Sequence, residues 1–147
     1  NAFQSAQISD YSGIEIYEFS PEDQLVMVMC AIGSYQPSFQ LFRMLDHSPE
    51  PLNLDTFAAP EGLSTQKVTK AEFWGEAAVS FDQQELFILN FSRQTRDCGT
   101  WANYSLSGKK VVLKAFRFHL PCAEAPEESI KTGASKPPEG WKQMSVH

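Results

Sequence analysis

The stretch from residue 96 to residue 122 carries the strongest local structural signal in this chain. Ser107 and Gly108 separate two runs that are rich in β-branched and aromatic residues. A turn dipeptide between two such runs is typical of a β-hairpin. Cys98 and Cys122 lie at the outer ends of the two runs, so a disulfide between them would close the hairpin at its base. We therefore predict a hairpin joined by this pair.

The three cysteines allow three single pairings, each of which leaves one thiol over. The hairpin register favours Cys98 with Cys122. Closing a loop of this size typically contributes about 3 kcal/mol, and such a bond persists in an oxidising compartment. Three buried, reduced thiols in a cytosolic domain are the alternative. Cys30 lies within an apolar run, and we expect it to be a small buried side chain rather than a reactive thiol.

Short apolar segments alternate with turn residues along the whole chain, and no long window has the apolar spacing of a helix. Residues 25–32 are apolar on both parities, which predicts a central strand that is covered on both faces. Residues 71–79 alternate with period two, which predicts one strand with its small residues inward. Residues 46–51 contain two prolines and are expected to form a loop.

Further strands are expected at residues 14–19, 39–45, 52–57 and 86–91, and in the two arms of the hairpin. In the second arm the apolar residues change parity, which a bulge near Lys114 would explain. Seven or eight short strands with turns between them predict a mainly β fold. We expect one antiparallel β-sandwich or barrel-like domain with few or no helices.

The length of 147 residues suits a single domain covering residues 1–147. Residues 1–12 are polar and are predicted to be a loose lead-in, and the start at Asn1 rather than Met predicts a processed or trimmed N-terminus. Residues 123–147 are rich in Pro, Glu, Lys and Gly, so this tail cannot bury enough apolar surface to order itself. Trp141 is the residue expected to pin the tail to the body.

The overall charge argues against several classes of partner. The formal net charge is −6 and no block of Lys and Arg interrupts it, so we expect no binding to nucleic acid. The longest apolar run is strand-sized, so we expect no membrane span. The three histidines do not lie at metal-ligand spacing, and no phosphate loop, dinucleotide fingerprint or nucleophile elbow occurs, so we expect no metal and no cofactor.

Two groups of residues are candidates for ligand binding. Glu72, Trp74 and Glu76 share one parity of the strand expected at residues 71–79, and two carboxylates around an indole could bind a sugar ring. Their separation of about 13 Å is too long for the carboxylate pair of a glycosidase. A solvated outer face, with Trp74 packed under a loop or under the tail, is the simpler interpretation.

The second group is Arg93, Arg96 and Asp97, beside the expected disulfide. Arginines in a loop on a rigid base could bind an anionic ligand or the carboxylates of a partner. A structural role is favoured instead, in which Asp97 accepts backbone N–H groups at the turn.

Several motifs occur in an order that resembles the C-terminal part of an uncharacterised bacterial family, domain of unknown function 1176. They are the apolar strand ending in C-A-I-G-S-Y-Q, the sequence Asp97-Cys98-Gly99, the hairpin with Trp101, and Cys122 followed by Trp141. The resemblance spans roughly residues 24–141. Ser34 and Gln36 depart from the family pattern, in which Ala and Asn are expected. The resemblance implies an exported bacterial protein of β-rich fold, periplasmic or secreted, and it implies no reaction.

The leading functional hypothesis is a binding or interaction module without catalytic activity that recognises a protein or a glycan. A hydrolase acting on a cell-envelope polymer is the first alternative, and a structural domain that depends on an N-terminal partner domain is the second. An enzyme should show a pocket with convergent carboxylates or histidines. A binding module should show an exposed aromatic or loop patch, and a structural domain an apolar patch near its N-terminus.

Overall fold

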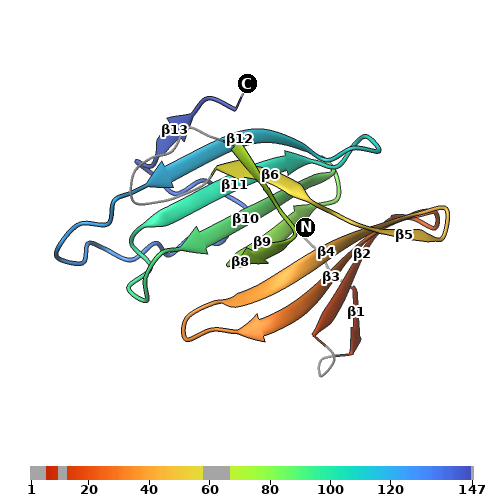
Figure 1. The fold of residues 1–147 in the computed structure, drawn as a ribbon, viewed down its shortest axis with the longest axis horizontal. Helices are drawn as coiled ribbons and strands as arrows, with labels where there is room; N and C mark the ends of the chain where they lie inside the picture. The colour runs from red at the N-terminus through yellow and green to blue at the C-terminus, as the bar shows by residue number, and fades with distance from the viewer. Residues whose placement is uncertain (1–5, 10–12, 58–66, 147) are drawn as a thin grey trace.

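The computed structural model describes residues 6–9, 13–57 and 67–146 (Figure 1). Within these residues the regular structure consists of β-strands, all paired antiparallel, and it includes no helix. The described part therefore has no helix of the length and hydropathy needed to cross a membrane. The mainly β, antiparallel class predicted from the spacing of turns is confirmed.

The first half of the chain forms the larger sheet, which we call the N-terminal sheet. Its strands are β1 (Ala6–Ser9), β2 (Ile14–Ser20), β3 (Asp23–Ile32), β4 (Pro37–Leu45), β5 (Ser48–Pro51) and β8 (Glu72–Trp74). The order across the sheet is β1-β2-β3-β4-β5, and β8 pairs with the other half of β4. The sheet is thus a meander of neighbouring hairpins with β8 added from later in the chain.

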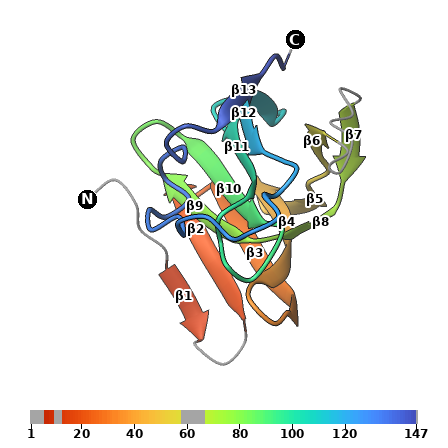
Figure 2. The same ribbon diagram turned by 90° about the vertical axis from the view of Figure 1, so that its left-hand side faces the viewer.

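The second half forms the C-terminal sheet, in the order β13-β12-β11-β10-β9. Its strands are β9 (Glu76–Ser80), β10 (Glu85–Phe91), β11 (Gly99–Ser105), β12 (Val112–His119) and β13 (Lys142–Met144). A separate ribbon is made by β6 (Leu54–Phe57) and β7 (Lys67–Lys70). In the described residues the two large sheets keep separate edges, so the fold is sandwich-like and not a barrel (Figures 1 and 2).

The main core lies between the two sheets. Alternate side chains of β3 and β4 meet alternate side chains of β10, β11 and β12, because side chains on a strand point to opposite faces in turn. The buried members include Tyr17, Leu25, Phe39, Leu41, Phe73, Val79, Leu86, Ile88, Ala102, Tyr104, Leu113 and Phe116. The ribbon β6–β7 closes one side through Leu54 and Phe57, and Phe57 packs edge-on against Phe116 with ring centroids 4.9 Å apart.

A second hydrophobic cluster lies on the other face of the C-terminal sheet. The segment after β12, residues 123–141, runs across this face (Figure 2). Ala134 and Trp141 of the segment are buried against Phe87, Leu89, Phe91 and Trp101 of the sheet. The Trp101 indole N–H donates a hydrogen bond to the Ala134 carbonyl at 2.8 Å, and Trp141 stacks on His119. The C-terminal sheet is therefore covered on both faces.

The hairpin signal at Ser107 and Gly108 is confirmed, with β11 and β12 joined by a loop over residues 106–111. The pairing passes from Asn103 opposite Ala115 to Tyr104 opposite Leu113, which leaves Lys114 as the bulged residue. This is the bulge that the change of parity predicts.

The predicted disulfide between Cys98 and Cys122 is present, with Cα atoms 5.4 Å apart. Cys98 is fully buried, and Cys122 lies three residues after the end of β12. The bond therefore joins the entry to β11 to the start of the segment that covers the sheet.

Four expectations about the first half of the chain are wrong. Residues 1–12 were expected to be a loose lead-in, but residues 6–9 form β1, which pairs with β2, and the rest of that segment lies outside the described residues. Residues 46–51 were expected to be loop, but they form a tight turn and the edge strand β5, where prolines are tolerated because an edge strand leaves N–H groups unpaired. Residues 25–32 were expected to be covered on both faces, but only one face of β3 is covered and Ile32 is 83% exposed. Cys30 was expected to be buried, and it is an exposed free thiol.

Candidate functional site

The chain passes from one sheet to the other at Gly75. Residues 71–79 were predicted to be one strand, but β8 ends at Trp74 in the N-terminal sheet and β9 begins at Glu76 in the C-terminal sheet. Gly75 has a φ of +134°, and a Cβ there would lie 2.2 Å from the carbonyl oxygen of Leu89. Only glycine fits this backbone conformation and this close approach, so the period-two pattern is interrupted where the chain changes sheet.

This crossing separates the three residues predicted to share one strand face. Glu72 lies opposite Gln40 in the N-terminal sheet, whereas Glu76 lies opposite Leu89 in the C-terminal sheet. The expected arrangement of two carboxylates around Trp74 is therefore wrong. Glu72 and Trp74 do line a common cavity of about 230 Å³ between the sheets, together with Asn90 and Ser92.

Glu76 is engaged with Arg96 and not with Trp74. The Arg96 guanidinium donates to the Glu76 carboxylate at 2.7 Å, and its carbon lies 4.3 Å from the centre of the Phe91 ring. Both partners of this ion pair are about one third exposed, so water screens the attraction. The pair ties the loop before β11 to the start of β9.

Arg93 and Asp97 form a clasp in which the Asp97 carboxylate is buried and the Arg93 side chain is 27% exposed, and this fits the structural role that was favoured for them. The Arg93 Nε and Nη2 groups donate to the two Asp97 carboxylate oxygens at 2.9 and 2.6 Å, and Nη1 donates to the Ala123 carbonyl at 2.7 Å. Asp97 also accepts the Thr95 hydroxyl and the Glu127 N–H. The bonds from Arg93 hold the pKa of Asp97 far below its ordinary value, against the opposite effect of burial.

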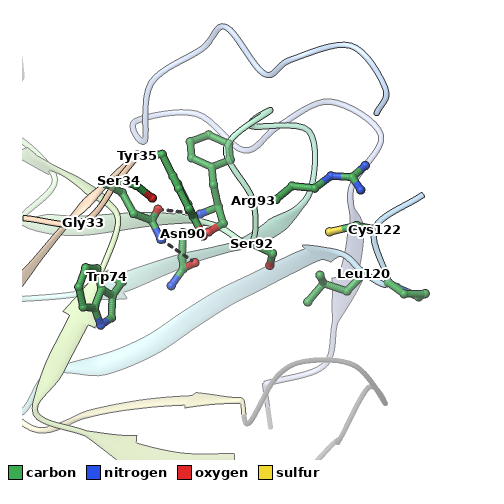
Figure 3. A pocket seen from close by; sticks show the side chains of 12 residues that line it. Gly33, Ser34, Tyr35, Trp74, Asn90, Ser92, Arg93, Leu120 and Cys122 are labelled. Atoms are coloured by element: carbon green, nitrogen blue, oxygen red, sulfur yellow. Dashed lines mark hydrogen bonds between the residues drawn. The ribbon is translucent and has the colours of Figure 1, made fainter. Parts of the chain in front are cut away.

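An open groove of about 990 Å³ runs beside this clasp (Figure 3). The indole of Trp74 lies at one end, Arg93 and Cys122 lie at the other, and Asn90 and Ser92 lie between them. Trp74 is 40% exposed. The other lining residues come from the turn after β3 and from the exit of β12, and they are Gly33, Ser34, Tyr35, Gln36, Phe91, Leu120 and Pro121.

The floor of the groove is held by the side chain of Gln36. Its amide N–H donates to the Phe91 carbonyl at 3.0 Å, and its amide oxygen accepts the Phe91 N–H at 2.9 Å. The β9–β10 pairing ends at Leu89, so Gln36 satisfies the backbone groups that β9 leaves unpaired after the chain turns away at Gly75. Gly33 allows the turn to lie against Trp74, because a Cβ there would lie 2.9 Å from the indole ring.

Of the residues that line the groove, the sequence indicated Trp74 and Arg93 as candidates for ligand binding and Cys122 as a disulfide partner, and the others were missed. The turn at residues 33–38 was interpreted by its composition alone. An aromatic and an amide within one turn were the available signal, but their partner Phe91 lies 55 residues away from Gln36 in the sequence. Nothing in the local pattern indicates that pairing.

The groove offers hydrogen-bonding groups and aromatic surface, and it offers few charges. Its lining residues include no carboxylate and no imidazole, and the Arg93 guanidinium is occupied by Asp97 and the Ala123 carbonyl. The Asn90 Nδ2 and the Ser92 hydroxyl make no hydrogen bond with the part of the chain that the structure describes. Among the same residues, no three His, Cys, Asp or Glu side chains gather as they would around a metal ion.

No protein-family model, no curated protein and no solved structure matches this chain. The resemblance to the family domain of unknown function 1176 is therefore a prediction from the sequence motifs around Cys98, Cys122 and Trp141.

Proposed function

We propose that this protein is a non-catalytic binding module that takes a neutral glycan chain into the groove between Trp74 and Arg93. The observation that carries the proposal is the half-exposed indole of Trp74 at the mouth of a large open groove. A sugar ring has an apolar face and a polar edge, so it needs a flat apolar side chain beside hydrogen-bonding groups. Trp74 supplies the first, and Asn90, Ser92 and Ser34 supply the second.

The charges of the groove favour a neutral ligand over an anionic one. Among the described residues, Arg93 is the single cation that lines the groove, and all three of its guanidinium nitrogens donate to protein oxygens. Binding an anion there would require breaking the clasp with Asp97. The disulfide at Cys98 supports an oxidising compartment for this activity, and we place the protein in the periplasm or outside the cell.

Quenching of tryptophan fluorescence by iodide tests the glycan proposal. Trp74 is 40% exposed, whereas Trp101 and Trp141 are 4% and 5% exposed, so quenching reports mainly on Trp74. Short oligomers of glucose and of N-acetylglucosamine serve as probes. We expect at least one of the two series to protect the indole from iodide. We expect Asn90→Ala to weaken the affinity for that oligomer by about tenfold, because a hydrogen bond to the bound sugar is lost.

A matched control is Val112→Ala, since Val112 is exposed at the far end of β12 and does not line the groove. This variant should bind like the wild type. Retention of the protein on the immobilised oligomer should be lost in Trp74→Ala and preserved in Val112→Ala. Unchanged retention of Trp74→Ala, or no protection of the indole by any oligomer, would contradict the proposal.

A hydrolase acting on an envelope polymer has weaker support. Glycosidases pair two carboxylates across the scissile bond, and Glu72 is the one carboxylate that lines the cavity beside the groove. Glu76 is held by Arg96. Measuring the release of reducing ends from the oligomer that binds tests this alternative, and we expect none above the uncatalysed rate. Release that disappears in Glu72→Gln would favour the hydrolase.

A further inference from the structure

The face of the N-terminal sheet that points away from the core carries a group of apolar side chains, with Gln24 and Gln40 in the outer rows. The register places Ile16, Val26 and Phe42 in one row across β2, β3 and β4, with Pro51 of β5 next in line. Val28 and Met44 lie on the same face in the neighbouring rows, because residues two apart on a strand share a face. We call these residues, Ile16, Val26, Val28, Phe42 and Met44, the open face.

The open face takes no part in the packing between the two sheets. All five side chains remain partly exposed, and none belongs to either hydrophobic cluster. Their neighbours on the opposite face, such as Leu25 and Leu41, are fully buried in the main core. The two sets of side chains differ in exposure because only Leu25, Leu41 and the residues beside them point toward the C-terminal sheet.

The composition of β3 is that of a strand with a covering on each side. Its run from Leu25 to Ile32 is apolar on both parities, and strands of this kind are normally buried on both faces. A contiguous apolar patch that water reaches marks an interaction site. The open face therefore has the composition of an interface that lacks its second layer.

The segment of the chain that carries the open face is acidic. Residues 13–57 contain seven carboxylates and one guanidinium, and that guanidinium, on Arg43, is buried and paired with Asp23. Glu18 lies beside the open face, in the row of Met44, and it is exposed. Glu22 and Asp46 lie on adjacent turns at the same end, where the Asp46 N–H donates to the Glu22 carbonyl at 2.8 Å. These exposed carboxylates attract cations and repel anions.

We propose that the open face docks a segment of a partner protein that presents apolar side chains flanked by lysines or arginines. The apolar residues would cover Val26 and Phe42, and the basic residues would lie near Glu18, Glu22 and Asp46. Such complementarity selects the partner and speeds its approach. A second copy of this chain carries the same net charge of −6 and would be repelled, as would an anionic membrane, and salt screens this repulsion.

Cys30 supplies the reporter for a test, since it is an exposed free thiol two residues after Val28 on β3. An environment-sensitive fluorophore is attached there in the full chain. The probe is a synthetic amphipathic helix made of leucine and lysine, and a scrambled peptide of the same composition is its control. We expect the ordered peptide to shift the emission, the scrambled peptide to bind about tenfold more weakly, and salt to weaken both.

The variants Phe42→Lys and Val112→Lys form a matched pair, because each replaces an apolar side chain by one positive charge and only the first lies on the open face; Phe42 is partly exposed and Val112 is exposed. Phe42→Lys should weaken docking about tenfold, and Val112→Lys should bind like the wild type. Val26→Thr, which preserves the β-branched shape, serves if circular dichroism shows that Phe42→Lys does not fold. Equal binding by both lysine variants overturns the proposal. So does a wild-type dimer in sedimentation equilibrium that Val26→Thr dissociates, since the occupant is then a second copy.

Discussion

The outer faces of the two sheets are alike in composition and opposite in environment. Phe87, Leu89 and Trp101 on the C-terminal sheet are buried by residues 123–141, whereas Val26 and Phe42 on the N-terminal sheet stay partly exposed and belong to neither hydrophobic cluster. Both sheets were built from strands with apolar residues on both faces. The comparison shows that apolar residues on both faces of a strand do not by themselves ensure that both faces are covered. Which sheet is covered depends on where the segment after β12 runs.

Residues 123–141, which cover the outer face of the C-terminal sheet, are held there by hydrogen bonds and a disulfide as well as by their few apolar side chains. The disulfide fixes the start of the segment, and Asp97 accepts the Glu127 N–H at 2.8 Å. Farther along, the Ile130 N–H donates to the Arg96 carbonyl at 2.7 Å, and Ala134 accepts the Trp101 indole N–H. A segment rich in proline and charge is ordered here because its anchors lie at intervals along its length.

The largest expected difference in the free energy of unfolding is between two alanine variants, each of which removes an aromatic side chain from the outer face of one sheet. Trp101→Ala removes a buried indole and its hydrogen bond, so it should lower the free energy of unfolding by about 4 kcal/mol. Phe42→Ala on the uncovered face should cost about 1 kcal/mol or less, because that ring is already partly solvated. Urea denaturation measures both. Similar losses in the two variants would mean that the open face is covered after all.

The next effect in size is that of the disulfide. Replacing Cys98 and Cys122 together by alanine frees a loop with a sequence separation of 24 and should lower the free energy of unfolding by about 3 kcal/mol. The covering segment should also loosen, which would raise the binding of a hydrophobic dye to the C-terminal sheet. Cys30→Ser is the matched control and should change neither property, since Cys30 is exposed and unpaired.

A smaller loss of stability, which depends on pH, is expected when Asp97 is replaced. Its pKa is lower in the folded protein than in the unfolded chain, so its contribution to stability is complete above about pH 4 and is lost as the pH falls through the folded-state pKa. Asp97→Asn should lower the free energy of unfolding at neutral pH by about 2 kcal/mol. Thermal denaturation from pH 7 to pH 2 should show a shallower decline for this variant than for the wild type.

The control for that measurement is Asp82→Asn, which changes an exposed carboxylate in the turn between β9 and β10. It should follow the wild-type curve within about 0.5 kcal/mol. An acid-side slope that is unchanged in Asp97→Asn would show that Asp97 does not anchor residues 123–141.

Features that depend on near neighbours in the chain could be predicted from the sequence. The hairpin around Gly108, its disulfide and the bulge at Lys114 all follow from turn residues and from the parity of apolar side chains within one arm. The ion pair of Arg93 with Asp97 joins residues four apart, and its structural role was the favoured interpretation. The candidate site was predicted less well, because Trp74 and Asn90 come together only across the two sheets.

The amino-acid sequence by itself determined the β class and the disulfide-closed hairpin. It also showed that β3 has apolar residues on both faces, but the prediction that both faces are covered was wrong. The tertiary structure alone decided three things: the crossing at Gly75, the groove that Gln36 closes against Phe91, and the choice of which outer face is covered. The physical reason is that a period-two pattern records which side chains avoid water, and it carries no information about which distant segment removes that water. That assignment depends on contacts between residues far apart in the chain.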